Sequence, residues 1–216
     1  MTATTISYKK SASLVPGGNL NPRNVQRLRL KRIQLYLIKK FLSLDDCVRL
    51  IELALPQFTS STTVGHTADL SYRTSKTCYL SPDEDGFVEE IENKISHCLG
   101  IRQSYSEAMQ LQIYEKRDEY KPHYDFFNPT KAALSGQRTW TFMICLESAT
   151  EGGGTHFLEQ GLTLYPAPGE ALVWNNLDQF GTPNTHTSHQ GLPVVQGRKT
   201  IVTKWFKDRG KGRAWY

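Results

Sequence analysis

His123 and Asp125 are the residues whose types and spacing first suggest chemistry in this sequence. They lie in the stretch Tyr-Lys-Pro-His-Tyr-Asp-Phe at positions 120 to 126. On a β-strand, residues two apart point to the same face, so an imidazole and a carboxylate would project side by side while Tyr124 turns away. One more histidine would complete a set of two imidazoles and one carboxylate, which suits non-haem Fe(II) and leaves positions open for substrate and O₂.

Four further histidines are near enough in the chain to be considered as the third ligand. His97 lies in a helical pattern, and we interpret it as structural. His156 follows a run of glycines and Thr155. His186 and His189 lie in a segment rich in Thr, Asn and Ser, and Gln-Gly-Leu-Pro-Val follows His189 directly. The residues alone leave the choice of partner open.

The composition predicts one soluble globular domain with a sizeable core. The chain has 216 residues, of which 38% are hydrophobic and 22% charged. The formal net charge of +5 and the pI of about 9.0 permit an acidic or nucleic-acid partner without requiring one. Basic residues concentrate at 23–32, at 39–40 and at 204–213. We interpret both basic regions as solvated faces or tails.

The four cysteines, at positions 47, 78, 98 and 145, include no Cys-x-x-Cys pair. They lie in apolar or helical patterns, which predicts buried free thiols. The chain contains no run of 18 apolar residues, and its N-terminal stretch is polar without an apolar signal core. These features predict a cytoplasmic, reducing location with no membrane partner.

Two amphipathic helices are predicted before the His-x-Asp motif. Ser43 and Asp46 form a capping-box pattern, apolar residues continue it at helical spacing, and Pro56 ends it. The stretch at 81–84, Ser-Pro-Asp-Glu, predicts the start of a second helix, because it combines a cap, a proline at the first position and acidic residues. Its apolar stripe runs to Ile95, and Gly100 ends it.

Most of the remaining pattern predicts strands. Residues 27–31 alternate basic and apolar, which is compatible with a strand, a nuclear-import-like patch or a polyanion contact; a strand is favoured. Residues 33–37 alternate in the opposite phase, which predicts a strand toward Phe41, and the phase change marks either its start or a bulge. From Met109 onward, short strands are predicted at 109–115, 140–146, 162–165, 171–174 and 200–206. Helices followed by many antiparallel strands predict an α+β fold built on a small two-sheet barrel.

We expect three regions along the chain. Residues 1–24 carry little that could be buried and are predicted to form a flexible N-terminal arm. Residues 25–208 form the single domain, and residues 209–216 form a basic C-terminal tail.

The second half of the sequence resembles the 2-oxoglutarate- and Fe(II)-dependent dioxygenases, most closely their prolyl 4-hydroxylase branch. The pattern extends over roughly residues 33–206, and the whole series stands in the family's order. The matching pieces are Tyr114…Tyr120-x-x-His123-x-Asp125, Arg138-x-x-Thr141, Glu151-Gly-Gly-Gly-Thr155-x-Phe157, Pro168-Gly169-x-Ala171, His189-x-Gly191-x-Pro193-Val194 and Gly197-x-Lys199 with Trp205. The sequence departs from the family at 115–119, where Glu-Lys-Arg-Asp-Glu replaces the usual Gly-Gln turn.

The resemblance implies a double-stranded β-helix (jelly-roll) core with supporting N-terminal helices. It implies that the metal ligands are His123, Asp125 and His189, and that His186 is a polar loop residue. It also implies that Lys199 binds the distal carboxylate of the co-substrate 2-oxoglutarate, aided by hydroxyl groups of Tyr114 and Thr155. A buried cation is the physical requirement for holding that carboxylate.

By the same resemblance, the substrate groove beside the iron would be lined by Arg138, Tyr120, Trp205 and Arg73. The implied reaction is hydroxylation of C4 of a proline in a peptide or protein. It uses Fe(II), O₂ and 2-oxoglutarate, yields succinate and CO₂, and is expected to depend on ascorbate. Two alternatives stay open: an oxygenase of the same class that acts on a free amino acid or an alkylated nucleic acid, and a non-catalytic metal-binding jelly-roll module.

Overall fold

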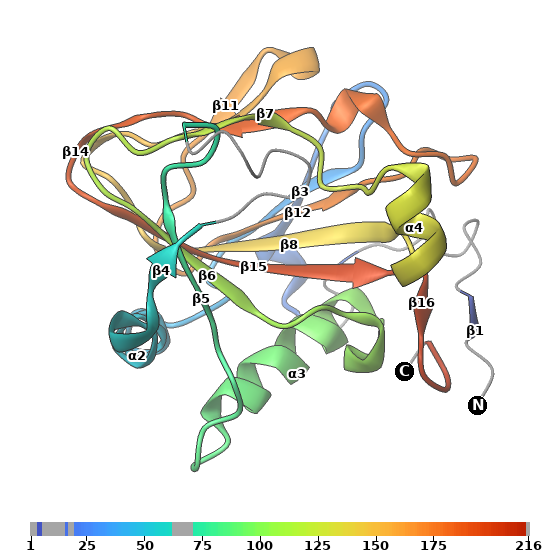
Figure 1. Ribbon diagram of the computed structural model, residues 1–216, viewed down its shortest axis with the longest axis horizontal. Coiled ribbons are helices and arrows are strands. Elements are labelled where there is room, and N and C mark those ends of the chain that lie inside the picture. Colours follow the sequence, from blue (N-terminus) through green and yellow to red (C-terminus); the bar gives the residue numbers. More distant parts are fainter. Residues whose placement is uncertain (1–3, 6–15, 17–19, 62–70, 215–216) are drawn as a thin grey trace.

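Two main antiparallel sheets, two short strand pairs and three α-helices are the principal elements of the described part of the chain (Figure 1). The structure is a computed structural model, and it describes residues 4–5, 16, 20–61 and 71–214. His66 lies outside these residues. No helix in the described ranges is both long enough and apolar enough to cross a lipid bilayer.

The larger sheet has eight strands, which run through the centre of the molecule. In spatial order they are β2 (Val25–Leu28), β3 (Leu35–Ile38), β12 (Ala171–Asn175), β8 (Arg138–Glu147), β15 (Lys199–Lys207), β6 (Gln110–Tyr114), β5 (Lys76–Tyr79) and β4 (Thr59–Ser60). The smaller sheet contains β11 (Leu162–Leu164), β10 (Thr155–Phe157), β13 (His189–Gly191) and β7 (Tyr120–His123), in that order. Two further pairs join β1 (Thr4–Thr5) to β16 (Arg209–Gly210) and β14 (Val194–Gln196) to β9 (Glu151–Gly152).

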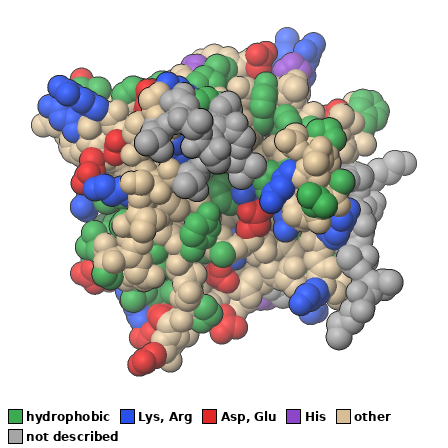
Figure 2. Space-filling model, viewed as in Figure 1, with side chains coloured by type: hydrophobic (Ala, Val, Ile, Leu, Met, Phe, Trp, Pro, Cys, Tyr) green, Lys and Arg blue, Asp and Glu red, His purple; other side chains and the backbone are tan. Residues whose placement is uncertain are grey.

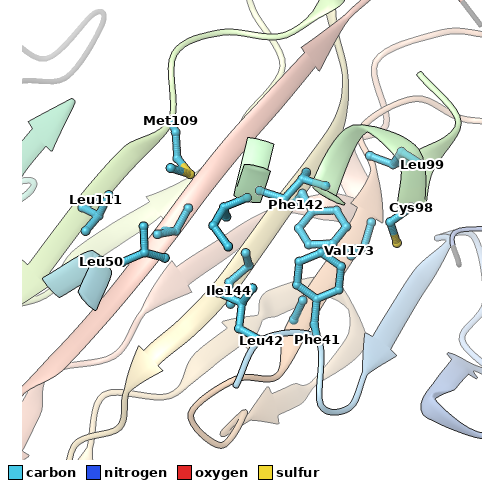
Figure 3. Close-up of a cluster of buried hydrophobic side chains, with 14 of the residues drawn as sticks. Phe41, Leu42, Leu50, Cys98, Leu99, Met109, Leu111, Phe142, Ile144 and Val173 are labelled. Atoms are coloured by element: carbon cyan, nitrogen blue, oxygen red, sulfur yellow. The ribbon is translucent and has the colours of Figure 1, made fainter. Parts of the chain in front are cut away.

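Helices cover one face of the large sheet, and the small sheet covers the other. Figure 1 shows α2 (Leu44–Ala54) and α3 (Phe87–Leu99) below the large sheet. Their apolar faces pack on the sheet in a cluster that includes Phe41, Leu50, Phe142 and Ile144 (Figure 3). Because β8 is covered on both sides, its central residues are all buried, which explains its nearly continuous apolar sequence.

A second apolar cluster lies on the opposite face of the large sheet. It includes Leu35, Met143 and Trp174 from the large sheet and Phe157 from the small one. The α+β class and the two-sheet core are therefore confirmed. All four cysteines are buried free thiols, as their patterns predict.

The local signals at the first helix are confirmed. Ser43 is the N-cap: its hydroxyl accepts from the backbone N–H of Asp46 at 3.0 Å, and the Asp46 carboxylate accepts from the Ser43 N–H at 3.1 Å. The α-helix ends at Ala54, and Pro56 lies in the 3₁₀ turn η2 (Leu55–Gln57) that follows. Gly100 ends α3 in the left-handed conformation that glycine adopts readily.

The predicted start of the second helix is wrong. Residues 81–86 form a loop, and α3 begins only at Phe87, with Gly86 as N-cap. The acidic residue still caps the helix from a distance, because the carboxylate of Asp83 accepts from the N–H of Val88 at 2.8 Å. The carbonyl of Asp83 also accepts from Gly86, which closes a turn instead of a first helical turn.

The strand predicted after the change of phase near Lys31 is confirmed as β3, and the phase change itself is the turn of a β-hairpin, in which β2 and β3 pair antiparallel, and not a bulge. A positive φ of 68° at Arg32 belongs to this turn. A short helix, α4 (Pro129–Ser135), was not predicted, although Asn128 caps it and Pro129 occupies its first position, both ordinary start signals.

Candidate active site

His123, Asp125 and His189 come together at one end of the small sheet. His123 ends β7 and His189 begins β13, and the two are direct cross-strand partners. Asp125 lies two residues beyond the end of β7, so it is not on the strand, yet it reaches the same side while Tyr124 is exposed. One ligand atom from each of the three residues lies within 4.8 Å of the others. The Asp125 Oδ2 and His189 Nε2 atoms are 3.8 Å apart.

Both imidazoles are held in the tautomer that a metal requires. Nδ1 of His123 lies 2.8 Å from the carbonyl oxygen of Lys121, and Nδ1 of His189 lies 2.9 Å from that of Thr187. A carbonyl oxygen only accepts, so each Nδ1 carries the proton and each Nε2 keeps its lone pair. Burial, reinforced by His189, lowers the pKa of His123 to about 3, so its imidazole is neutral near pH 7. The donor set therefore fits a divalent metal.

Asp125 is oriented by a hydrogen-bond relay from the large sheet. The hydroxyl of Thr141 donates to Asp125 Oδ2 at 2.7 Å, and the side-chain amide of Asn176 donates to the same hydroxyl oxygen at 2.9 Å. Thr141 and Asn176 are fully buried. Burial alone would raise the pKa of Asp125, but the two imidazoles, Arg138 and the Thr141 hydrogen bond outweigh it and lower the pKa. The carboxylate is thus ionised and fixed in direction.

Aromatic rings clamp both histidines. The ring of Tyr120 stacks on His123 with centroids 3.5 Å apart and an interplanar angle of 12°. Trp174, which lies on β12 of the large sheet, meets His189 edge to face at 4.9 Å. These contacts restrict rotation of the imidazoles, which preorganises the three ligand atoms.

A cavity of about 550 Å³ opens beside the three residues and extends between the sheets. Lys199, the first residue of β15, lines it together with Ile201, Thr203 and Trp205, so alternate residues of this strand face the cavity as predicted. Lys199 is 6% exposed, and within the described residues no carboxylate pairs with its ammonium group. Burial lowers its pKa to about 8.

Tyr114 and Thr155 both lie next to Lys199. The ammonium donates to the Thr155 hydroxyl at 3.4 Å and lies 5.6 Å from the centroid of the Tyr114 ring. Tyr114 is also the cross-strand partner of Lys199. Its hydroxyl donates to the side-chain carbonyl of Gln112 at 2.9 Å. A buried cation surrounded by neutral groups is a suitable site for an anion.

Arg138 and Trp205 form a platform on another wall of the cavity. The Arg138 guanidinium carbon lies 3.9 Å from the centroid of the Trp205 ring. Two of the Arg138 nitrogens donate to the carboxylate of Glu107, at 2.9 and 2.6 Å, and a third donates to the backbone carbonyl of Asp125 at 3.3 Å. Arg138 thereby links the platform to the candidate metal site.

Arg73 is buried on the side of the cavity formed by β5 and β6. Its guanidinium donates to the side-chain oxygens of Ser75, Thr77 and Gln110, at 3.1 to 3.2 Å. It also lies 4.9 Å from the centroid of the Tyr120 ring. Like Lys199, it forms no ion pair with a carboxylate of the described residues.

The other described histidines lie outside the cluster. His97 is exposed and bonds to the carbonyl of Asn93. His156 bonds to the hydroxyl of Thr163, and His186 lies near Glu159 and Arg32. Arg198 faces away from the cavity and pairs with Glu147, as its adjacency to Lys199 predicts.

Several residues at the site had no predicted role. Thr141 stands in a motif without an assigned function, and Asn176 and Glu107 were not singled out. The signal at Thr141 is a buried hydroxyl within an apolar strand, which requires a polar partner. No local signal marks Asn176 or Glu107, because each acts on a residue more than 30 positions away.

Known proteins resemble this chain in both sequence and structure. Residues 109–207 match the family model described as the 2OG-Fe(II) oxygenase superfamily. A probable prolyl 4-hydroxylase 6 of Arabidopsis thaliana is 31% identical over 202 residues, which cover 82% of this chain and 70% of the relative. The prolyl 4-hydroxylase subunit alpha-2 of Gallus gallus is 30% identical over 173 residues, but the match spans only 32% of that subunit.

Solved structures of prolyl hydroxylases have a similar fold. The viral collagen prolyl hydroxylase of Paramecium Bursaria Chlorella virus-1, in its 2OG complex, has a TM-score of 0.61 and 26% identity, with 82% of this chain and 96% of that chain covered. A prolyl hydroxylase from Trichoplax adhaerens, in complex with a hypoxia inducible factor peptide fragment, has a TM-score of 0.57 at 17% identity and supports the fold alone. The predicted double-stranded β-helix core is confirmed.

Proposed function

Because the chain belongs to the 2OG-Fe(II) oxygenase superfamily, in its prolyl 4-hydroxylase branch, we propose that it hydroxylates C4 of proline in a peptide or protein. It is a 2-oxoglutarate-dependent dioxygenase. One observation carries the proposal: a single cavity joins a set of two imidazoles and one carboxylate to a buried lysine without an acidic partner among the described residues.

In this proposal, His123 and His189 hold Fe(II) through Nε2 and Asp125 holds it through its carboxylate. When bound, iron with 2-oxoglutarate and O₂ supplies C–H hydroxylation coupled to decarboxylation of 2-oxoglutarate to succinate and CO₂. The carbonyl groups of Lys121 and Thr187 fix the tautomer and orientation of the two imidazoles, and the Thr141 hydroxyl orients the Asp125 carboxylate. The protein holds the metal and the substrate in fixed positions, and this chemistry needs no side chain to act as a general base.

Lys199 holds the distal carboxylate of 2-oxoglutarate. Its ammonium is desolvated and has only the Thr155 hydroxyl as a hydrogen-bonding partner within the described residues. An anion placed there recovers the free energy that burial removes from the ammonium. The hydroxyl groups of Thr155 and Tyr114 add hydrogen bonds to the same carboxylate. The Tyr114 ring, whose centroid lies 5.6 Å from the ammonium, stabilises the positive charge.

The rim of the cavity favours a proline-containing peptide. The Tyr, Phe and Trp side chains that line the cavity are Tyr72, Tyr79, Tyr114, Tyr120, Tyr124, Phe126, Phe127, Trp174 and Trp205. Extended proline-rich segments dock in grooves lined by aromatic rings, and such segments need little ordering. In this proposal, the Arg138 and Trp205 platform borders the peptide beside the metal site, Tyr120 covers His123, and Arg73 lines the part of the cavity near β5 and β6.

The test is release of CO₂ from 2-oxoglutarate with Fe(II) and ascorbate, across proline-rich peptides, free proline and methylated single-stranded DNA. We expect the peptides to stimulate release and to gain one oxygen on proline. Stimulation by free proline or by DNA alone would keep the class and refute the peptide substrate. No release above a His123→Ala control, together with no iron binding, would indicate a non-catalytic module.

We also propose that turnover depends on ascorbate and that the protein is cytoplasmic. Omission of ascorbate from the assay tests the first proposal, and cell fractionation tests the second.

A further inference from the structure

The charges of this protein are segregated along the chain. The first 44 residues contain nine of the 26 basic residues and none of the 21 acidic ones, a net charge of +9. The remaining 172 residues carry 17 basic and 21 acidic residues, a net charge of −4. Acidic side chains gather instead at the lower end of the molecule in Figure 2, near the loop that leads into α3. The basic pI therefore originates in one short region.

Seven of the nine basic residues lie on a single ordered element, which we call the basic hairpin. It comprises residues 23–40: the end of η1 (Pro22–Asn24), then β2, the turn, β3 and the two lysines that follow. All seven basic side chains are exposed, and none forms an ion pair within the described part of the chain. They are Arg23, Arg27, Arg29, Lys31, Arg32, Lys39 and Lys40.

The pairing of the hairpin places these charges along one edge of the large sheet. β2 is the edge strand, and Val25 pairs with Ile38 while Leu28 pairs with Leu35. The N–H of Lys39 donates to the carbonyl of Asn24, which sets the two lysines beside Arg23. Arg23 and the two lysines therefore lie at one end of the hairpin, Arg27 lies on β2 with Arg29 just beyond it, and Lys31 and Arg32 lie at the turn.

We propose that the basic hairpin binds the phosphate backbone of a nucleic acid. This goes beyond the proposed hydroxylase function and does not depend on it. Duplex DNA carries one negative charge per about 1.7 Å of axis, which is dense enough to supply a phosphate to each cation that faces it. Four of the seven cations are arginines, whose forked donors fit phosphate oxygens. Charged side chains also protect an edge strand from pairing, but Arg23, Lys31 and Arg32 lie outside β2, so edge protection does not account for them.

The surroundings of the hairpin disfavour two other polyanions. An extended peptide rises about 3.3 Å per residue, so even one with an acidic side chain at every residue carries only about half the charge density of the duplex. A membrane surface would call for exposed apolar anchors between the charges. Instead, Leu28 and Leu30 pack inward, and no large apolar side chain of residues 20–42 is strongly exposed. Because the aromatic rings of residues 20–42, Tyr36 and Phe41, are both buried and cannot stack on bases, binding is expected to be insensitive to sequence.

The test is fluorescence anisotropy of a labelled 20-base-pair duplex titrated with the full chain at several salt concentrations. The hairpin variant carries Arg23→Gln, Arg27→Gln and Lys39→Gln. A matched control carries Lys116→Gln, Lys211→Gln and Arg213→Gln, which removes the same charge from exposed positions elsewhere. We expect the hairpin variant to bind at least tenfold more weakly at about 0.1 M salt, and its salt slope to fall by about 2 to 3, since each phosphate contact contributes about 0.9.

Three results would overturn the proposal. The first is no binding of the duplex at low salt by the wild-type chain. The second is an equal loss in the hairpin and control variants, because only net charge would then matter. The third is tight, hairpin-dependent binding of polyglutamate or of phosphatidylserine vesicles while the duplex fails to bind. Unchanged thermal unfolding of both variants would show that the exposed substitutions leave the fold intact.

Discussion

Replacing Lys199 by methionine should weaken 2-oxoglutarate binding and stabilise the empty protein at the same time. Methionine keeps the unbranched shape and most of the length of the side chain, and removes its charge. The opposite signs follow from one feature, a buried ammonium group with no carboxylate partner among the described residues. If Lys199 had a purely structural role, its replacement by methionine would destabilise the empty protein.

The size of the stability effect follows from the pKa. Burial lowers the pKa of Lys199 from 10.5 to about 8. Each pKa unit corresponds to 1.36 kcal/mol, so the site disfavours the ammonium form by about 3 kcal/mol. The unfolded chain binds the proton more tightly, so this loss of stability is complete below pH 8 and disappears as the pH rises toward 10.5. Lys199→Met should therefore raise the free energy of unfolding by up to about 3 kcal/mol at pH 7, and by little at pH 10.5.

The effect on the co-substrate has the other sign. Removing one partner of a buried, hydrogen-bonded ion pair costs about 2 to 5 kcal/mol. At 1.4 kcal/mol per tenfold change, the Kd for 2-oxoglutarate should rise by about 30-fold to several thousand-fold. Calorimetry with Mn(II) in place of iron measures this without turnover, and urea unfolding of the metal-free protein measures stability. A variant that unfolds more easily and binds 2-oxoglutarate normally would refute the reasoning.

Four further predictions follow from the same site and fold. His123→Ala should abolish Fe(II) binding and turnover while His186→Ala keeps most of both; the reverse result, read by metal titration and CO₂ release, would contradict the ligand assignment. Thr141→Val should weaken Co(II) binding by about 10- to 100-fold and alter its visible spectrum, because Asp125 loses its orienting donor, whereas Thr141→Ser should restore both. Above pH 8 the wild-type Kd for 2-oxoglutarate should rise up to tenfold per pH unit, since binding then requires a proton on Lys199; a Lys199→Arg variant that binds at all should show no such rise, and an equally steep one would place the titration elsewhere. Ser43→Ala should lower the free energy of unfolding by about 1 kcal/mol through loss of the capping box, and an unchanged urea midpoint would show that the cap contributes nothing.

Local features of the fold were predictable because they depend on residues close together in the sequence. The capping box at Ser43 and the stop at Gly100 each involve contacts within one or two helical turns. The alternation of β15, which turns Lys199 and Trp205 to the same cavity, follows from the two-residue period of a strand. The predicted start of α3 was wrong because Asp83 can either close a turn or begin a helix, and the local sequence does not decide between these two roles.

The arrangement of the site was decided only by the tertiary structure. Sequence spacing placed His123 near Asp125, and resemblance pointed to His189, but the pairing of β7 with β13 sets the two imidazoles opposite each other. A register shift opposite the first residues of β8 lets Arg138 and Thr141 both face the active site, although residues three apart on a regular strand face opposite sides.

The physical reason is that these contacts join residues far apart in the chain. The Asn176–Thr141–Asp125 relay connects two interior strands of the large sheet, β12 and β8, to the end of the small sheet, and its geometry depends on how the two sheets pack. The basic hairpin illustrates the same point. The sequence alone determined that positive charge concentrates near the N-terminus, and the antiparallel pairing of β2 with β3 decided that this charge lines one exposed edge.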